Sequence, residues 1–278
     1  MGKPYFSVII PTYNRSQFLK TAIESVLNQT FKDFELIIID DGSQDNTYNL
    51  VKSFKDTRII YKKQEHQGVS SSRNQGIILS RAEIIAFLDS DDRFKPQKLE
   101  LAAEYIEKFP DIRIFHTEEL WYQRKKLLNQ KKIHKKPDGF VFKNSLKLCC
   151  ISLSTVVTKK SLFKEVGLFD ETLPACEDYE LWLRACVKYP VKLIPYILTL
   201  KEGGHSDQLS KKYIAMDTFR IYAIDKLLKS KKITLTPEQR ENAIKELKKK
   251  CLIYIKGAKK RNKTKEVESY STLMQSYS

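Results

Sequence analysis

Short apolar runs alternate with amphipathic stretches along the first 110 residues. The runs are rich in Ile, Val, Leu and Phe and are bounded by polar or turn residues, so they predict β-strands at residues 6–10, 34–39, 58–61 and 84–88. Apolar positions three or four apart predict helices after Asn14, over 45–54, over 71–80 and from Pro96 to Phe109. This alternation is typical of an α/β fold with a mainly parallel sheet and helices on both faces.

The pattern changes beyond Pro110. Residues 112–116 and 152–158 favour strands, and 181–187 favour a helix. The lysine-rich stretch 122–138 is typical of a loop or hairpin.

The C-terminal part of the chain reads differently again. Small polar residues fill 203–210, which predicts a mobile loop. After it we expect only helices, with Pro237 in the first turn of a final helix that begins after Thr236. The sequence thus predicts a sheet-containing domain over 1–210 and a basic helical C-terminal region over 211–278.

The composition is that of an ordinary folded protein, with 41% apolar and 30% charged residues. The net charge of +16 is concentrated near the C-terminus, because residues 226–265 hold fifteen Lys or Arg and three Glu. Such a stretch can follow anionic lipid headgroups or nucleic acid, or it can form a solvated face. A membrane-surface role and a solvated face therefore both stay open.

No apolar stretch is long enough to cross a bilayer. The nearest, 191–200, is interrupted by Lys192 and Pro195, and the N-terminal apolar run is too short for a signal peptide. The five cysteines form no Cys-x-x-Cys pair, which favours reduced thiols. We therefore expect a cytoplasmic protein, either free or peripheral on the inner face of the plasma membrane.

Polar clusters follow three of the predicted strands directly, at residues 11–15, 40–43 and 89–92. In an open α/β sheet, ligands bind in the crevice beyond the carboxyl ends of the strands, so the clusters are expected to converge on one site. The sequence has neither a Gly-x-Gly-x-x-Gly nor a P-loop motif. A dinucleotide fold and a P-loop nucleotidase are therefore not supported.

The third cluster is strongly acidic, with Asp89, Asp91 and Asp92 at the end of one strand. Such a site repels a diphosphate unless a cation lies between them, and Mg²⁺ or Mn²⁺ binds carboxylate and phosphate oxygens together. The alternative is that an Asp-rich turn caps a helix or fills a loop without any metal.

Five motifs occur in an order that resembles the family-2 inverting glycosyltransferases of GT-A fold, a Rossmann-like fold of nucleotide-diphospho-sugar transferases. They are Pro-Thr-Tyr-Asn-Arg at 11–15, Asp-Asp-Gly-Ser-x-Asp at 40–45, Gly-Val-Ser-x-x-Arg-Asn-x-Gly at 68–76, Phe-Leu-Asp-Ser-Asp-Asp at 87–92 and Glu-Asp-Tyr-Glu-Leu-Trp at 177–182. The resemblance covers roughly residues 4–210. It implies a nucleotide-binding part over 1–110 and an acceptor-binding part over 111–210.

The resemblance also implies a set of nucleotide-binding residues. Tyr13 would stack on the base, Asp41 would accept a hydrogen bond from it, and Asp40 would support the turn. The full set is Pro11, Thr12, Tyr13, Arg15, Asp40, Asp41, Arg73, Asp89 and Ser90. UDP is the nucleotide that the resemblance favours.

Two further roles follow from the resemblance. Asp91 would be the principal ligand for Mn²⁺ or Mg²⁺, and His205 would complete the metal shell. The acceptor is a glycan or a lipid-linked glycan, most simply in bacterial surface polysaccharide synthesis.

Asp178 is the candidate general base, on chemical grounds and by the resemblance. Inverting displacement at an anomeric carbon needs a group that takes the acceptor hydroxyl proton, and a carboxylate can do so. The alternative is that Glu177 and Asp178 are acids favoured by the dipole at a helix N-terminus. Glu177 and Glu180 are weaker candidates for the base.

Two other interpretations fit parts of the sequence. Asp-x-Asp after an apolar strand also opens haloacid-dehalogenase-like phosphatases, but here the motif lies 88 residues into the chain and continues with Asp92 and Arg93. A non-catalytic basic binding module would explain the charge but not the aspartates, because the basic residues gather in the tail. No nucleic-acid partner is expected.

Overall fold

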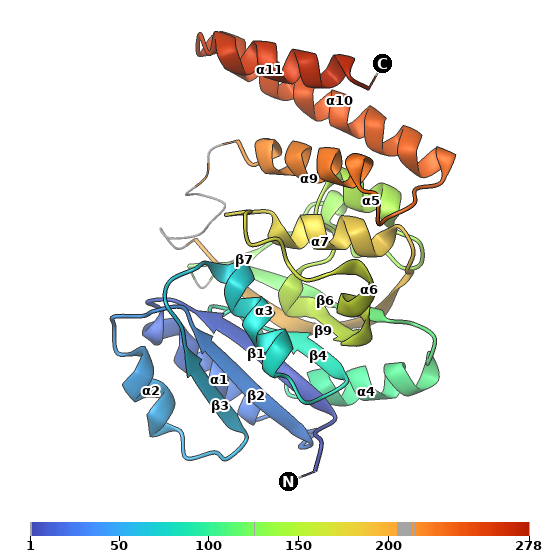
Figure 1. Ribbon diagram of the computed structural model, residues 1–278. Coiled ribbons are helices and arrows are strands. Elements are labelled where there is room, and N and C mark those ends of the chain that lie inside the picture. The colour runs from blue at the N-terminus through green and yellow to red at the C-terminus, as the bar shows by residue number, and fades with distance from the viewer. Residues whose placement is uncertain (1, 125, 205–212, 214, 278) are drawn as a thin grey trace.

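A mixed β-sheet forms the centre of the protein in this computed structural model, which describes residues 2–124, 126–204, 213 and 215–277 (Figure 1). Over these residues the strand order is β3-β2-β1-β4-β8-β6-β9-β5, with β7 paired to β6. The first four strands are parallel: β1 (Phe6–Thr12), β2 (Phe34–Asp40), β3 (Ile59–Lys63) and β4 (Ile84–Phe87). Their carboxyl ends therefore lie at one edge of the sheet.

The second part of the sheet is mostly antiparallel, although β6 and β9 run parallel to each other. Its strands are β5 (Arg93–Phe94), β6 (Ile114–Gln123), β7 (Lys126–Leu128), β8 (Val156–Lys159) and β9 (Val191–Gly203). β6 and β7 form a hairpin, one of the two outcomes expected for the lysine-rich stretch.

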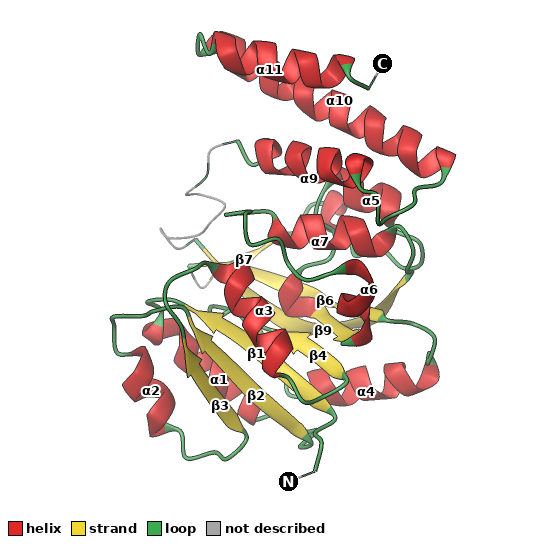
Figure 2. Ribbon diagram, in the orientation of Figure 1, coloured by secondary structure: helices red, strands yellow, loops and turns green. Residues whose placement is uncertain are grey.

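Helices cover both faces of the sheet, as Figure 2 shows. On one face lie α1 (Ser16–Leu27) and α4 (Lys98–Lys108), whose buried apolar residues pack with Val8 and Ile10. On the other face Ile9 packs with α3 (Val69–Leu79) and with a cluster that includes α7 (Glu177–Cys186). Because successive strand residues point to opposite faces, a strand buried on both sides is apolar at every position.

Shorter helical elements complete the domain. They are α2 (Thr47–Ser53), α5 (Phe142–Lys147), α6 (Ser161–Val166) and the 3₁₀ turns η1 (Lys132–His134) and η2 (Leu153–Thr155).

Gly76 fixes how closely α3 lies on β1. A Cβ at this position would come within 2.4 Å of Ile9 Cγ2, so any other residue would force Ile9 or α3 to shift. This close packing holds α3, and the arginine that it carries, beside the ends of the parallel strands.

Three helices form the C-terminal region: α9 (Asp217–Lys229), α10 (Pro237–Lys260) and α11 (Thr264–Gln275). Thr236 caps α10 in a capping box with Gln239, and Pro237 occupies the first turn as predicted. Buried residues of α9 and α10 belong to the same apolar cluster as Trp182 of α7. The division of the chain at residue 210 stays a prediction.

Several expected elements differ from the observed ones. Pro96 precedes α4 instead of lying in its first turn, since the N-cap is Gln97. Residues 153–155 form a 3₁₀ turn before β8, not a strand. α10 is followed by α11, so the helix opened by Pro237 is not the final one. None of the described helices has the length and apolar character needed to cross a bilayer.

Candidate active site

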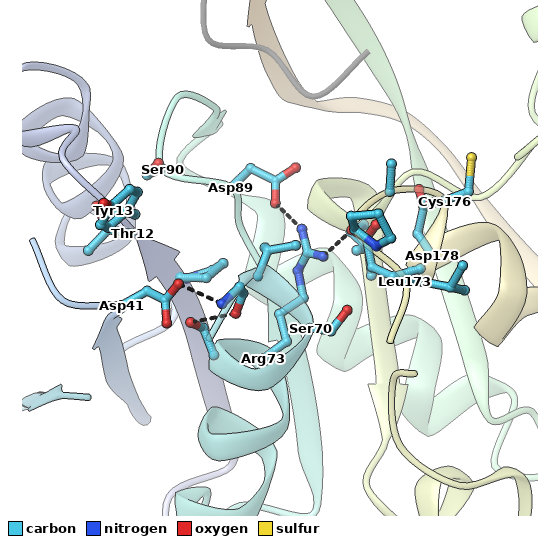
Figure 3. A pocket seen from close by; sticks show the side chains of 18 of the residues that line it. Thr12, Tyr13, Asp41, Ser70, Arg73, Asp89, Ser90, Leu173, Cys176 and Asp178 are labelled. Carbon is cyan, nitrogen blue, oxygen red and sulfur yellow. Dashed lines mark hydrogen bonds and ion pairs between the residues drawn. The ribbon is translucent and has the colours of Figure 1, made fainter. Parts of the chain in front are cut away.

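A cavity of about 990 Å³ opens where β1 and β4 end, between α3 and the start of α7 (Figure 3). It collects residues from all three strand-end clusters and from the Glu-Asp motif at 177–178. The predicted site residues that line it are Pro11, Thr12, Tyr13, Arg15, Asp41, Arg73, Asp89, Ser90, Asp91 and Asp178. His205 lies outside the described residues.

Arg73 links the two sides of the cavity. From α3 it donates through Nη2 to Asp89 Oδ1 (2.8 Å), as Figure 3 shows, and through Nη1 to Glu177 Oε1 (2.5 Å). Burial lowers the pKa of Arg73, but the carboxylates of Asp89 and Glu177 raise it by more than burial lowers it. The net pKa is therefore above its usual range, and the guanidinium stays charged. Because Arg73 bridges these two carboxylates through charged hydrogen bonds, it fixes the end of β4 relative to the first turn of α7.

Each aspartate of the acidic cluster faces a cation. Besides the pair of Asp89 with Arg73, Arg15 Nη1 donates to Asp91 Oδ2 (2.6 Å). Lys201 Nζ lies 3.6 Å from Asp92 Oδ2. Buried charges are tolerated when they are paired, so these contacts let three carboxylates share one strand end.

The three carboxylates nevertheless differ. Burial raises the pKa of Asp89, but Arg73 and then Lys201 lower it, with a net decrease. Burial raises the pKa of Asp91 and Asp92 overall, despite Arg15 and Lys201. For Asp91 and Asp92 the effect of burial on the pKa therefore exceeds that of the neighbouring cations.

The nucleotide side of the cavity is formed by Tyr13 and Asp41. Asp41 Oδ1 accepts from the backbone N–H of Gln67 (3.0 Å), and Oδ2 accepts from that of Gly68 (2.8 Å). His66 Nδ1 lies 2.7 Å from Asp41 Oδ2, and its ring stacks on Tyr13 with 4.0 Å between centroids. This loop therefore brings an aromatic face and a fixed carboxylate together.

Two buried hydroxyl groups in the cavity lack partners. Thr12 Oγ1 and Ser70 Oγ make no hydrogen bond within the described part of the chain. Buried polar atoms are normally satisfied, so both point to a polar ligand or water in the cavity. Asp40, in contrast, does not line the cavity: it accepts from Ser43 N–H (2.7 Å) and from the Tyr61 hydroxyl (2.5 Å), which supports the turn.

Asp178 differs from its acidic neighbours on α7. Glu177 is held by Arg73, and Glu180 by Arg184 (2.6 Å) and Lys226 (2.8 Å). Among the described residues Asp178 has no Lys or Arg partner, and it lines the cavity. It is therefore the carboxylate of this turn that is available to take a proton.

The remaining contacts of Asp178 are to uncharged groups. Cys149 Sγ lies 3.2 Å from Asp178 Oδ2, and the Tyr179 backbone N–H donates to Oδ1 (2.6 Å). Burial, and then the Asp178 carboxylate, raise the pKa of Cys149, which keeps it a thiol.

Sequence reasoning missed two of these residues. Lys201 lies on β9, whose apolar run was examined only as a candidate membrane span, although an apolar run bounded by turn residues also fits a strand. Cys149 gave no signal, because contact with Asp178 depends on the packing of a loop 29 residues away.

The cavity fits a divalent cation that a bound ligand helps to hold. No cluster of three or more His, Cys, Asp or Glu that could hold a metal occurs among the described residues, so an all-protein cage is absent there. Asp91 lines the cavity, is partly buried and is paired with Arg15 through Oδ2. Mg²⁺ is commonly held by one or two carboxylates together with substrate phosphates.

The family model for glycosyl transferase family 2 matches residues 7–165, more than half of the chain. The chain is 32% identical over 220 residues to an uncharacterised glycosyltransferase of Rickettsia felis, covering 75% of this chain and 36% of that protein. It is 31% identical over 185 residues to WfaP of Escherichia coli, a UDP-Glc:α-D-GlcNAc-diphosphoundecaprenol β-1,3-glucosyltransferase, covering 66% of this chain and 70% of WfaP. The chain thus spans about a third of the length of the Rickettsia relative.

Two solved structures share the fold. TarS 1–349 of S. aureus, in complex with UDP-GlcNAc, superposes with a TM-score of 0.70 at 17% identity, covering 98% of this chain and 91% of that one. The mannosyltransferase PcManGT of Pyrobaculum calidifontis, in complex with GDP-Man and Mn²⁺, gives a TM-score of 0.62 at 14% identity, covering 99% and 84%. At these identities the likeness concerns the fold alone, and it confirms the expected GT-A architecture.

Proposed function

The chain belongs to glycosyltransferase family 2, and we propose that it transfers a sugar from a nucleoside-diphosphate sugar to an acceptor hydroxyl with inversion at the anomeric carbon. The observation that carries this proposal is a single cavity lined both by the acids at 89–92 and by Asp178. The first set suits the diphosphate end of a donor, and Asp178 suits the acceptor.

In the proposed reaction Asp178 takes the proton of the acceptor hydroxyl. The acceptor oxygen then forms a bond to the anomeric carbon as the bond between that carbon and the diphosphate oxygen breaks. The nucleoside diphosphate leaves with the electron pair of that bond. Attack opposite the leaving group inverts the configuration, and a positioned carboxylate contributes a factor of ~10²–10⁴ to such a step.

The nucleotide would lie against the loop that holds Tyr13 and Asp41. Tyr13 offers a face for stacking, although His66 covers one side of the ring here. Arg73, Asp89 and Ser90 would contact the ribose or diphosphate, and the free hydroxyls of Thr12 and Ser70 are further donors.

Asp91 is the proposed protein ligand for Mn²⁺ or Mg²⁺, and His205 is proposed as a second ligand. When bound, the cation would neutralise charge that develops on the departing diphosphate. PcManGT, which shares the fold, was solved with Mn²⁺.

UDP is the proposed nucleotide, and the acceptor is proposed to be a glycan or lipid-linked glycan of a bacterial surface polysaccharide. Support comes from WfaP, whose name gives UDP-Glc as donor and a diphosphoundecaprenol-linked sugar as acceptor. Residues 1–110 would bind the nucleotide and 111–210 the acceptor. A lipid-linked acceptor would also place the enzyme at an anionic membrane surface, to which the basic segment 226–265 is suited.

The experiment that tests this function is a panel of nucleotide sugars, screened with Mn²⁺ for thermal stabilisation and for slow hydrolysis. A ligand at 100 times its Kd stabilises the folded state by ~2.7 kcal/mol, which is easily measured. We expect UDP and one or more UDP-sugars to raise the unfolding temperature. If no nucleoside diphosphate does so, and simple phosphate monoesters are hydrolysed instead, the phosphatase interpretation replaces this one.

A further inference from the structure

One face of α10 combines exposed apolar residues with a ring of lysines. Leu252 and Ile253 are 57% and 55% exposed at the middle of the second half of the helix. The exposed lysines around them lie three, four, seven or eight positions away, on the same side of the helix. They are Lys245, Lys249, Lys256, Lys259 and Lys260.

The orientation of this face is fixed by the opposite side of the helix. Leu247 and Cys251 are fully buried in the apolar cluster shared with α7 and α9, and Ala258 is fully buried as well. α10 cannot rotate to hide Leu252 and Ile253 without exposing these three residues. In Figure 1, α10 and α11 form the layer farthest from the N-terminus.

The lysines of the face are not neutralised by neighbours. Within the described ranges, Lys245, Lys256, Lys259 and Lys260 have no ion-pair partner. Lys249 has a long contact, 3.9 Å, to Glu246. The acids Glu238 and Glu241 lie near the helix N-terminus, away from the apolar pair.

We propose that this face of α10 docks on an anionic lipid bilayer, with Leu252 and Ile253 at the boundary of headgroups and acyl chains and the lysines at lipid phosphates. Amphipathic surface helices bind in this way, by buried apolar area together with attraction to anionic lipids. The purpose of docking, access to a lipid-linked acceptor, rests on the proposed function, but the docking itself does not.

The chemistry of the face favours lipid over the other basic-surface ligands. Protein surfaces that bind nucleic acid use arginine and aromatic side chains to contact the bases. This face of α10 instead presents lysines and two aliphatic residues. A second copy of α10 is not favoured, because it would bring two sets of unpaired ammonium groups together and they would repel each other. A bilayer offers both the negative charge and the apolar depth that the face requires.

The test is sedimentation of the full chain with vesicles of phosphatidylcholine containing 30% phosphatidylglycerol, against pure phosphatidylcholine, at low and high salt. We expect binding to the anionic vesicles alone, weakening at least ~10-fold at high salt. Lys256→Gln/Lys259→Gln/Lys260→Gln should weaken it by ~10–100-fold. Leu252→Gln/Ile253→Gln should weaken binding to the anionic vesicles several-fold at low salt. It should also abolish the residual binding that the parent shows at high salt.

Two matched controls make the result specific. Lys20→Gln/Lys52→Gln/Lys55→Gln removes the same charge from exposed positions in or near α1 and α2, and Leu127→Gln/Leu128→Gln removes two exposed apolar residues from β7. Both should bind vesicles as the parent does. No sedimentation at low salt, or equal losses in the controls, would overturn the proposal.

A competition experiment with poly-U separates lipid from nucleic acid as the ligand. If poly-U displaces the protein from the vesicles, and Leu252→Gln/Ile253→Gln leaves vesicle binding unchanged, the docking proposal is also overturned. UDP affinity is measured on every variant. Docking without any UDP binding would contradict the proposed function alone, whereas UDP binding without docking would contradict this inference alone.

Discussion

The cavity and the outer face of α10 hold charge in opposite ways. In the cavity every acid of the cluster at 89–92 faces a cation, and Arg73 joins two carboxylates, those of Asp89 and Glu177. On α10, four of the five exposed lysines have no partner among the described residues. Charges removed from water must be paired, whereas exposed charges remain solvated and need no partner.

The difference explains why net charge was a poor guide to the chemistry of this protein. The value of +16 comes mostly from 226–265 and identifies a surface, not an active site. In the cavity, negative and positive side chains nearly balance, so the site contributes little to the net charge of the protein. Removing one charged group should therefore have large effects in the cavity and graded, salt-dependent effects on α10.

Asp178→Asn should have the largest effect of the substitutions in the cavity. The amide has the same shape and serves as well at a helix start, but it cannot take a proton, so transfer should fall ~10²–10⁴-fold. Steady-state transfer to the acceptor gives the loss, and titration with UDP should show an unchanged Kd.

The control makes the same chemical change on the other region. Glu241→Gln replaces an exposed acid on α10 and should leave the rate of transfer within twofold. Near-normal transfer by Asp178→Asn would contradict its assignment as the base. Glu177 would then be the next candidate, although its pair with Arg73 makes it less available.

Asp91→Asn should have the next largest effect, on metal dependence. If Asp91 holds the cation, Mn²⁺ should strengthen UDP binding to the parent by at least ~10-fold and should not strengthen binding to the variant. Isothermal titration with UDP in Mn²⁺ and in EDTA measures both. Asp33→Asn, an exposed change just before β2, is the control. Equal UDP affinity of the parent in Mn²⁺ and EDTA would contradict the metal site.

Much of the fold followed from hydrophobic periodicity. The four parallel strands were predicted to within two residues at each end, because strands buried on both faces are continuous apolar runs. The convergence of residues 11–13, 15, 41 and 89–92 on one cavity also followed, since parallel strands end at one edge.

What the sequence could not predict depends on contacts between distant segments. β9 pairs with β6 and β5 and has Pro195 near its middle, which made the run look interrupted. Lys201 reaches Asp92 only through that pairing. Similarly, the resemblance already favoured Asp178 over Glu177 and Glu180 as the base, but the ion pairs that hold the two glutamates are seen only in the folded chain.

Cys149→Ala tests the smallest effect, a neutral contact inside the charged cavity. The thiol lies 3.2 Å from Asp178 Oδ2 and can help to orient that carboxylate toward the acceptor. A net hydrogen bond contributes ~1 kcal/mol, so its loss should lower kcat for transfer about 5-fold and leave the Kd for UDP unchanged. Cys149→Ser, which keeps a donor, should restore most of the rate. Cys150→Ala is the matched control, because its sulfur contacts Ser145 (3.4 Å) and not Asp178. If serine and alanine at position 149 reduce transfer equally, or if the change at Cys150 costs as much, the thiol does not position the base.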